Sequence, residues 1–332
     1  MGLVAGELEQ PGGSIGMNLI AAASARVCEC NDLHPSEKLL EHRIPLAKIQ
    51  GRSRHEQPVR APNSIASTKA RINLGYSKMN ESNINPTLPV LQEIVAKPPV
   101  ALSYLPGQSG TLVICLAGVG TKRSQSPPRE FHKMASQEGA NHVLFVSDAS
   151  RSWMNGSGIA QQIVAAIEKL ADQVNATRIV ALGNSMGGTM ALMLAGLTQI
   201  DAAIAIVPQF SVHPERVPEE QRWRAFRNQI TDWPFETITR LHSEKTSIMI
   251  IHGVSPDERI HLDRFPKDAK AMHFVFPDMD HRLAFRLHKK RKLNRIIRHA
   301  IAARPWKLRR AIGQAGGLPR ELFERTQRQD QQ

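Results

Sequence analysis

The amino-acid sequence predicts an α/β protein in which a mostly parallel β-sheet is flanked by helices. Three observations support this fold class. Short apolar segments of strand length recur after residue 99, segments with helical spacing alternate with them, and the 332 residues are 41% hydrophobic, which is enough to bury a full core. Short buried strands that alternate with helices are typical of βαβ units, whose parallel sheets are covered on both faces.

The predicted elements follow one another in a regular order. Seven segments have the length and composition of strands: 101–104, 111–116, 142–146, 178–182, 202–207, 247–251 and 273–276. Apolar residues three or four positions apart predict a helix over 157–174, and a second helix is expected over 187–195. In such sheets the chemistry collects at the carboxyl ends of the strands, so the loops after these segments are where a site is expected.

Residues 1–86 lack this alternation. Proline, glycine, serine and asparagine interrupt them throughout, which predicts an irregular extension with at most a short helix over 35–50. The apolar piece that begins at Met17 has no basic residue before it and follows two glutamates, so it does not resemble a secretory signal. Met17 is also a second candidate for the start of the chain.

The cysteines and the hydropathy of the sequence indicate in which cellular compartment the protein is expected. No stretch approaches the roughly 18 to 20 consecutive apolar residues that a membrane-spanning helix needs. Cys28 and Cys30 have no second pair at the spacing of a zinc site, and Cys115 lies inside an apolar run, as a core residue does. These observations predict a cytoplasmic protein in a reducing environment, with no bound metal and no disulfide framework.

The net charge of +13 is concentrated near the C-terminus. From His281 to Gln332 there are 15 lysines and arginines against 3 acidic residues, and the stretch 282–310 holds most of them. Two interpretations stay open: contact with an anionic polymer or membrane surface, or the solvated face of a helix whose other side is apolar. The second is favoured, and the scarcity of aromatic residues argues against a nucleic-acid partner.

These patterns divide the chain into three parts. We expect an extension at 1–86, an α/β domain at 87–302 and a basic C-terminal tail at 303–332.

The strongest chemical signal is a G-x-S-x-G sequence at Gly183–Gly187, which directly follows the predicted strand 178–182. In a nucleophile elbow the serine sits on a sharp, strained turn, and small neighbours let strand and helix approach closely. The helix that follows presents its N-terminus to developing negative charge. A glycine-rich structural turn is the alternative, but the position between strand and helix favours Ser185 as a nucleophile in an α/β-hydrolase fold.

A serine hydroxyl needs a base to take its proton. In the α/β-hydrolase fold the chain order is serine, then acid, then histidine. His281 lies in the loop after the last predicted strand and is the expected base, although it also fits as the first residue of the basic helix. His252 ends a strand too, but it precedes a glycine and is interpreted as structural.

The remaining groups of the site follow from the same order. The acid should lie after the strand 247–251, where Asp257 fits best and Asp263 is the reserve, although either residue fits as a helix cap. The two backbone N–H donors for an oxyanion are expected from Met186, which follows the nucleophile, and from Val119, in the glycine loop after 111–116. The aromatic-rich segment 211–240 lies between two core strands and is expected to cover the site as a lid.

With these residues placed, the stretch from about Pro99 to Ile301 resembles α/β-hydrolase-like proteins encoded with bacterial capsule and exopolysaccharide genes. The matching segments are Leu112–Gly120, Val146–Asp148 with Ser152–Asn155, Gly183–Gly188, Pro208–Val212 with Pro218, Arg222 and Trp223, and Asp280–His281 with Leu283, Ala284 and Leu287. The resemblance covers about three fifths of the chain, and the basic tail departs from it.

The resemblance implies a hydrolase of acyl esters, acting on acylated glycans or on small molecules. It also implies that Asp148 and Trp153 line the substrate pocket, whereas the residue types alone fit a turn residue and a core aromatic equally well.

The expected reaction is therefore ester hydrolysis through an acyl-enzyme. Ser185 attacks, His281 moves the proton, Asp257 orients His281, and Met186 and Val119 hold the oxyanion, with no cofactor. Acyl transfer on the same residues and thioester hydrolysis stay open, as does a non-catalytic protein of the same fold that binds an anionic polymer or membrane.

Overall fold

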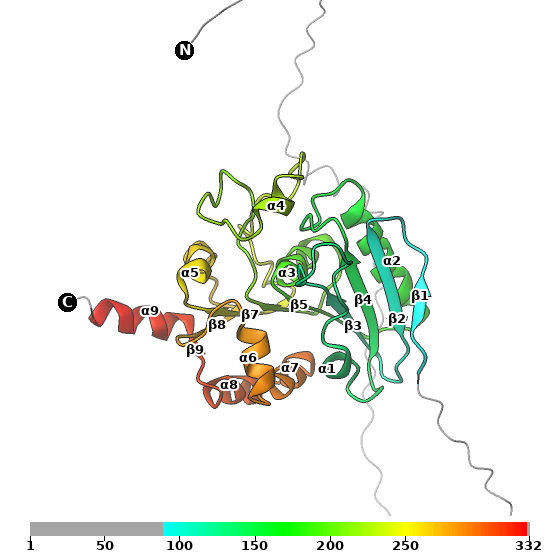
Figure 1. Cartoon of the computed structure of the whole chain (residues 1–332). Helices are drawn as coiled ribbons and strands as arrows, with labels where there is room; N and C mark the ends of the chain where they lie inside the picture. The colour runs from blue at the N-terminus through cyan, green and yellow to red at the C-terminus, as the bar shows by residue number, and fades with distance from the viewer. Residues whose placement is uncertain (1–88, 331–332) are drawn as a thin grey trace, which may run out of the picture. The chain divides into compact units, whose positions relative to one another are not determined.

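The computed structural model describes residues 89–330 (Figure 1). The extension predicted at 1–86, the short helix at 35–50 and the two cysteines at 28 and 30 lie outside the described residues. Among residues 89–330 no helix has the length and apolar character needed to cross a membrane, and no group of histidine, cysteine or acidic residues is placed to hold a metal ion.

A nine-stranded sheet forms the centre of the described chain, in the order β1-β2-β4-β3-β5-β6-β7-β8-β9. Its strands are β1 (Gln92–Ile94), β2 (Val100–Leu105), β3 (Thr111–Leu116), β4 (His142–Asp148), β5 (Arg178–Asn184), β6 (Ala202–Ile206), β7 (Ser247–Gly253), β8 (Met272–Phe276) and β9 (Leu318–Pro319). The six strands from β4 to β8 in this order pair in parallel, and β1, β2 and β9 add antiparallel edges. The predicted fold class is confirmed.

Helices cover both faces of the sheet. They are α1 (His132–Ser136), α2 (Ile159–Gln173), α3 (Met186–Leu197), α4 (Arg224–Arg227), α5 (Pro256–Leu262), α6 (Leu283–Lys289), α7 (Leu293–Ile301), α8 (Pro305–Gly313) and α9 (Arg320–Gln329). Figure 1 shows α3 on one side of the sheet and α1, α6, α7 and α8 on the other.

Strand β3 illustrates how the sequence builds two cores. Side chains of a strand alternate between faces, so Ile114 packs into the core beneath α2 and α3, whereas Val113 and Cys115 pack into the core beneath α6, α7 and α8. All three are 2% exposed or less. This burial on both faces explains why the strand is an uninterrupted apolar run.

The order of the strands places the site. The chain passes from β3 outward to β4 and then crosses back over β3 to β5, which makes β3 the point where the direction of the connections reverses. Loops at the carboxyl ends of strands diverge at such a point and leave room for a ligand. The loop after β3 and the turn after β5 carry Val119 and Ser185.

The expected separate tail at 303–332 is corrected by the structure. Strand β9 pairs with β8, α8 buries Leu308 and Ile312 in the second core, and Phe323 of α9 packs against the sheet beside Val275. The composition of this part is dominated by cations, yet apolar residues three or four positions apart give its helices a buried side. Residues 303–330 therefore belong to the α/β domain.

Candidate active site

Ser185 occupies a strained turn between β5 and α3. Its φ of 56° and ψ of −123° lie in a region that residues with a side chain rarely adopt. Two glycines make the turn possible: a Cβ on Gly183 would lie 2.1 Å from the Gly187 carbonyl carbon, and one on Gly187 would lie 2.0 Å from the Leu116 oxygen. The backbone N–H of Ser185 donates to the Ile206 carbonyl over 2.8 Å, which ties the turn to β6.

Three side chains from different segments of the chain form a continuous hydrogen-bonded row. His281 Nε2 lies 3.0 Å from Ser185 Oγ, and His281 Nδ1 lies 2.8 Å from Glu258 Oε1. A carboxylate accepts, so Nδ1 carries the proton, and Nε2 is left to accept the proton of the serine hydroxyl. Ser185 is 4% exposed and Glu258 1% exposed, so the row is largely shielded from water.

Glu258, rather than Asp257 or Asp263, is the carboxylate next to His281. Asp257 is exposed, and its backbone oxygen accepts from Arg222 over 3.1 Å; Asp263 pairs with Arg259 at the surface. The reason is the phase of α5, which begins at Pro256. Successive residues of a helix point about 100° apart, so Asp257 faces solvent while its neighbour faces the site.

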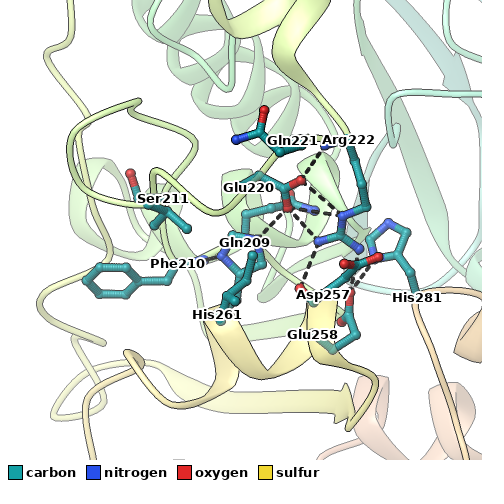
Figure 2. Close-up of polar contacts among 12 residues, drawn as sticks. Gln209, Phe210, Ser211, Glu220, Gln221, Arg222, Asp257, Glu258, His261 and His281 are labelled. Carbon is teal, nitrogen blue, oxygen red and sulfur yellow. Dashed lines mark hydrogen bonds and ion pairs between the residues drawn. The ribbon is translucent and has the colours of Figure 1, made fainter.

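A network of charged side chains also holds Glu258 (Figure 2). Arg222 Nη1 donates to Glu258 Oε1 over 2.9 Å, and Arg222 Nη2 donates to Glu220 Oε2 over 2.6 Å. The same Glu220 oxygen lies 2.8 Å from His261 Nε2. Arg222 is thus bonded to two carboxylates that are each 1% exposed, and Glu258 Oε1 is held by both Arg222 and His281.

The same contacts keep Glu258 ionised. Burial alone would raise the pKa of this carboxyl, but the hydrogen bond from His281, the nearby imidazoles and the Arg222 guanidinium outweigh it and lower the pKa to about 2. A permanent negative charge therefore faces the imidazole that would become positive when it takes the serine proton.

Gln209 contacts Ser185 from a further direction. Its Nε2 donates to Ser185 Oγ over 3.1 Å, and its Oε1 accepts from the Trp153 indole N–H over 3.0 Å. An indole nitrogen only donates, so the Gln209 amide must turn its oxygen toward Trp153. Its NH₂ group then faces Ser185. The serine oxygen then receives one proton from Gln209 and directs its own toward His281.

Sequence reasoning missed Gln209 and Glu258. The signal for Gln209 was a glutamine that follows a buried strand, in a segment that the family resemblance already singled out. The signal for Glu258 was a second carboxylate beside Asp257.

The two residues expected to line the pocket are both buried. Asp148 accepts hydrogen bonds from the backbone N–H groups of Ser150 and Ser152 within its own loop. Trp153 is 1% exposed, orients Gln209, and has its ring 6.5 Å from that of Trp223. The structure gives both side chains a role in shaping the loop, and their contact with a substrate stays a prediction.

The two expected oxyanion donors lie in the turn after β5 and in the loop after β3. Met186 is the first residue of α3, where backbone N–H groups have no acceptor within the helix. Val119 is held in place by its carbonyl, which accepts from Arg151 Nε over 2.8 Å. The neighbouring Gly118 donates its N–H to Glu130, a carboxyl whose pKa is raised to about 7 by burial.

The predicted lid segment 211–240 contains one short helix, α4. Trp223 lies over His281, with a distance of 5.6 Å between ring centroids, and the backbone N–H of Phe235 donates to Asn155 over 2.8 Å. The segment is thus in direct contact with the row of Ser185, His281 and Glu258.

The sequence also matches a protein-family model. Residues 147–299 match the model of the prolyl oligopeptidase family, a segment that contains Ser185, Glu258 and His281. No curated protein matches the sequence.

Several solved structures are similar to this chain at low identity. An α/β serine hydrolase without a lid from Xanthomonas campestris is 17% identical, with 66% of this chain and 95% of that chain covered and a TM-score of 0.42. The capsule O-acetyltransferase of Neisseria meningitidis serogroup A is 16% identical, with coverage of 62% and 93% and a TM-score of 0.45. The esterase LipW from Mycobacterium marinum is 14% identical, with coverage of 64% and 80% and a TM-score of 0.46. The sheet topology and the strained serine between β5 and α3 identify the α/β-hydrolase fold, and residues 147–299 are similar to the prolyl oligopeptidase family.

Proposed function

We propose that the protein cleaves carboxylic esters through an acyl-enzyme formed on Ser185, with His281 as the base and Glu258 as the acid of a catalytic triad. The observation that carries the proposal is the continuous row of hydrogen bonds, 2.8 Å from Glu258 to His281 and 3.0 Å from His281 to Ser185, at a serine held in a strained turn.

In the first half of the reaction Ser185 Oγ attacks the ester carbonyl carbon, and its proton passes to His281 Nε2. Glu258 stabilises the imidazolium that results. The N–H groups of Met186 and Val119 hold the negative oxygen of the tetrahedral intermediate. His281 then gives its proton to the departing alcohol, which leaves the acyl group on Ser185.

In the second half His281 removes a proton from water, and the hydroxide formed attacks the acyl-enzyme. The intermediate collapses with protonation of Ser185 Oγ, and the carboxylic acid leaves. Gln209 donates to Oγ in the resting enzyme, so it keeps the oxygen aligned with His281 before attack and after release.

The substrate class proposed is an acyl ester on a glycan hydroxyl or a small molecule, on the ground of the resemblance to capsule-associated hydrolases. Acyl transfer differs only in the second half, where a sugar hydroxyl takes the place of water. Thioester hydrolysis uses the same steps with a thiol as leaving group.

The test is hydrolysis of p-nitrophenyl acetate by the full-length protein, with Ser185→Ala compared with Ser136→Ala as a matched control. Ser136 is a buried serine on α1, 5% exposed, outside the site. We expect Ser185→Ala to lose at least about 10³-fold in kcat/KM and Ser136→Ala to stay within about twofold of wild type. Equal activity of wild type and Ser185→Ala would overturn the proposal.

Product analysis separates hydrolysis from transfer. Free acetate in the presence of an excess of an oligosaccharide acceptor supports hydrolysis, whereas acetylated oligosaccharide at the expense of acetate supports transfer.

A further inference from the structure

A second candidate site lies between α7 and α8 and includes none of the residues of the proposed triad. There a hollow of about 530 Å³ is lined by seven residues: Arg291, Asn294, Arg295, Arg298, His299, Lys307 and Arg310. Five of the seven carry a permanent positive charge, and none carries a negative charge. The volume falls within the roughly 300–1,000 Å³ of small-molecule pockets in proteins.

The two helices present these cations by their amphipathic faces. On α7 the buried positions include Ile296, Ile297 and Ala300, so Arg295 and Arg298 lie on the side turned from the core. On α8 Leu308 and Ile312 are buried. The apolar sides hold the helices on the sheet, and the opposite sides meet at the hollow.

The cations of the hollow have no acidic partner, whereas some other cations of the described residues do. No aspartate or glutamate occurs from His281 to Arg320 in the sequence. Among residues 89–330 none of the five forms an ion pair. By contrast, Arg286 pairs with Asp280, and Lys267 with Glu324. Like charges gathered without counter-charges repel, and a bound anion would relieve that repulsion.

The side chain of His299 is affected by the same cluster of positive charges. Its Nδ1 is buried and has no hydrogen-bond partner among the described residues. Burial lowers the pKa of this imidazole, and the neighbouring Arg295, Lys307, Arg304 and Arg298 lower it further. The hollow thus holds a polar atom without a partner in addition to its unpaired cations.

Arginines favour phosphate over a single carboxylate here. The guanidinium fork donates two parallel hydrogen bonds, which match the oxygens of a phosphate group, and several forks need several such oxygens. We propose that the hollow between α7 and α8 binds a ligand that carries two or more phosphate groups.

The shared chemistry is a cluster of phosphates, which a soluble phosphate compound or a phosphorylated lipid headgroup supplies. Trp306 on α8 is 77% exposed, and an exposed tryptophan beside cations is typical of a membrane interface. Binding to a lipid headgroup is therefore tested separately. A nucleic acid is disfavoured because no phenylalanine, tyrosine or tryptophan lines the hollow to stack on a base.

The experiment is a calorimetric titration of the full-length protein with tripolyphosphate at about 0.15 M salt, where diffuse surface attraction is screened. The hollow variant is Arg295→Gln/Arg298→Gln. The matched control is Arg325→Gln/Arg328→Gln, which removes the same charge from exposed positions of α9. We expect saturable binding at one site per chain, weakened at least about tenfold in the hollow variant and less than about twofold in the control.

Vesicles distinguish the two sources. A phosphorylated lipid headgroup is supported if the protein binds vesicles with phosphatidylinositol bisphosphate and tripolyphosphate displaces it. Phosphatidylserine vesicles of equal charge should then show no binding. Saturable tripolyphosphate binding without vesicle binding supports a soluble ligand. The proposal is overturned if tripolyphosphate does not saturate, if hollow and control variants lose affinity equally, or if the protein binds a single-stranded oligonucleotide that tripolyphosphate does not displace.

Discussion

Replacement of Glu258 by glutamine isolates the charge of the proposed triad acid. Glutamine keeps the shape of the side chain and an oxygen that accepts from both His281 and Arg222, so the geometry of the row is retained while its negative charge is lost. The charge matters when His281 becomes an imidazolium during attack by Ser185. In the resting enzyme the two hydrogen-bonded atoms are 2.8 Å apart.

The size of the effect follows from that contact. Taking about 4 Å between the centres of the two charges and an effective dielectric constant of about 20, the lost attraction is about 4 kcal/mol. A barrier raised by this amount slows the reaction about 10³-fold. We therefore expect kcat/KM for p-nitrophenyl acetate to fall by about 10³-fold in Glu258→Gln, with the thermal unfolding midpoint measured in parallel.

The neighbouring residue supplies the control. Asp257→Asn removes a carboxylate of the same helix turn that does not contact His281, so its kcat/KM should stay within about threefold of wild type. The reasoning is refuted if Asp257→Asn loses the larger factor, or if a folded Glu258→Gln keeps wild-type activity.

Three further predictions concern groups around the row. Gln209→Leu should lower kcat by about 10-fold or more with a smaller change in KM, because it removes the donor that aligns Ser185; equal changes in both constants would contradict this role. Gly187→Ala should destabilise the protein by about 3 kcal/mol or more in urea unfolding, because its Cβ would meet the Leu116 oxygen, whereas Gly313→Ala, with no neighbour within 4 Å, should be neutral. Burial raises the pKa of Glu130 to about 7, so this carboxyl ionises at a lower pH in the unfolded chain than in the folded protein. The free energy of unfolding should therefore fall as pH rises from about 4.5 to 7. The difference in unfolding free energy between wild type and Glu130→Gln should change by about 3 kcal/mol over that window, and a difference independent of pH would contradict it.

Much of the architecture was accessible from local patterns. Each of the seven predicted strands overlaps a strand of the sheet, and the helices expected over 157–174 and 187–195 correspond to α2 and α3. Fully buried strands are continuous apolar runs, so their positions stand out without knowledge of the pairing. The two strands not anticipated, β1 and β9, are short edge strands, whose pairing with β2 and β8 decides whether they form.

The site was predicted in part for a similar reason. The turn at Ser185 has a sequence signature because only glycine fits beside it, and His281 follows a recognisable strand. The choice between Asp257 and Glu258 depends on where α5 begins, and a shift of one residue turns a side chain by about 100°. Such a phase cannot be read from spacing alone. Arg222 and Gln209 act through contacts between segments far apart in the chain, which no local pattern encodes.

In the C-terminal part, the most conspicuous feature of the sequence led to a wrong prediction. Its charge dominated the interpretation of residues 303–332 as a tail, while three buried residues, Leu308, Ile312 and Phe323, determine that the segment packs onto the domain. A few well-spaced apolar side chains are enough to hold a cationic helix against a sheet, because its long charged side chains extend into water.

The most direct test of the central claim is labelling of the full-length protein by a fluorophosphonate probe, with mass spectrometry of the modified peptide. The account predicts one adduct per chain, on Ser185, and loss of labelling in His281→Ala, because the serine is reactive only while His281 accepts its proton. A folded wild-type protein that takes no label, or an adduct on another serine, would contradict it.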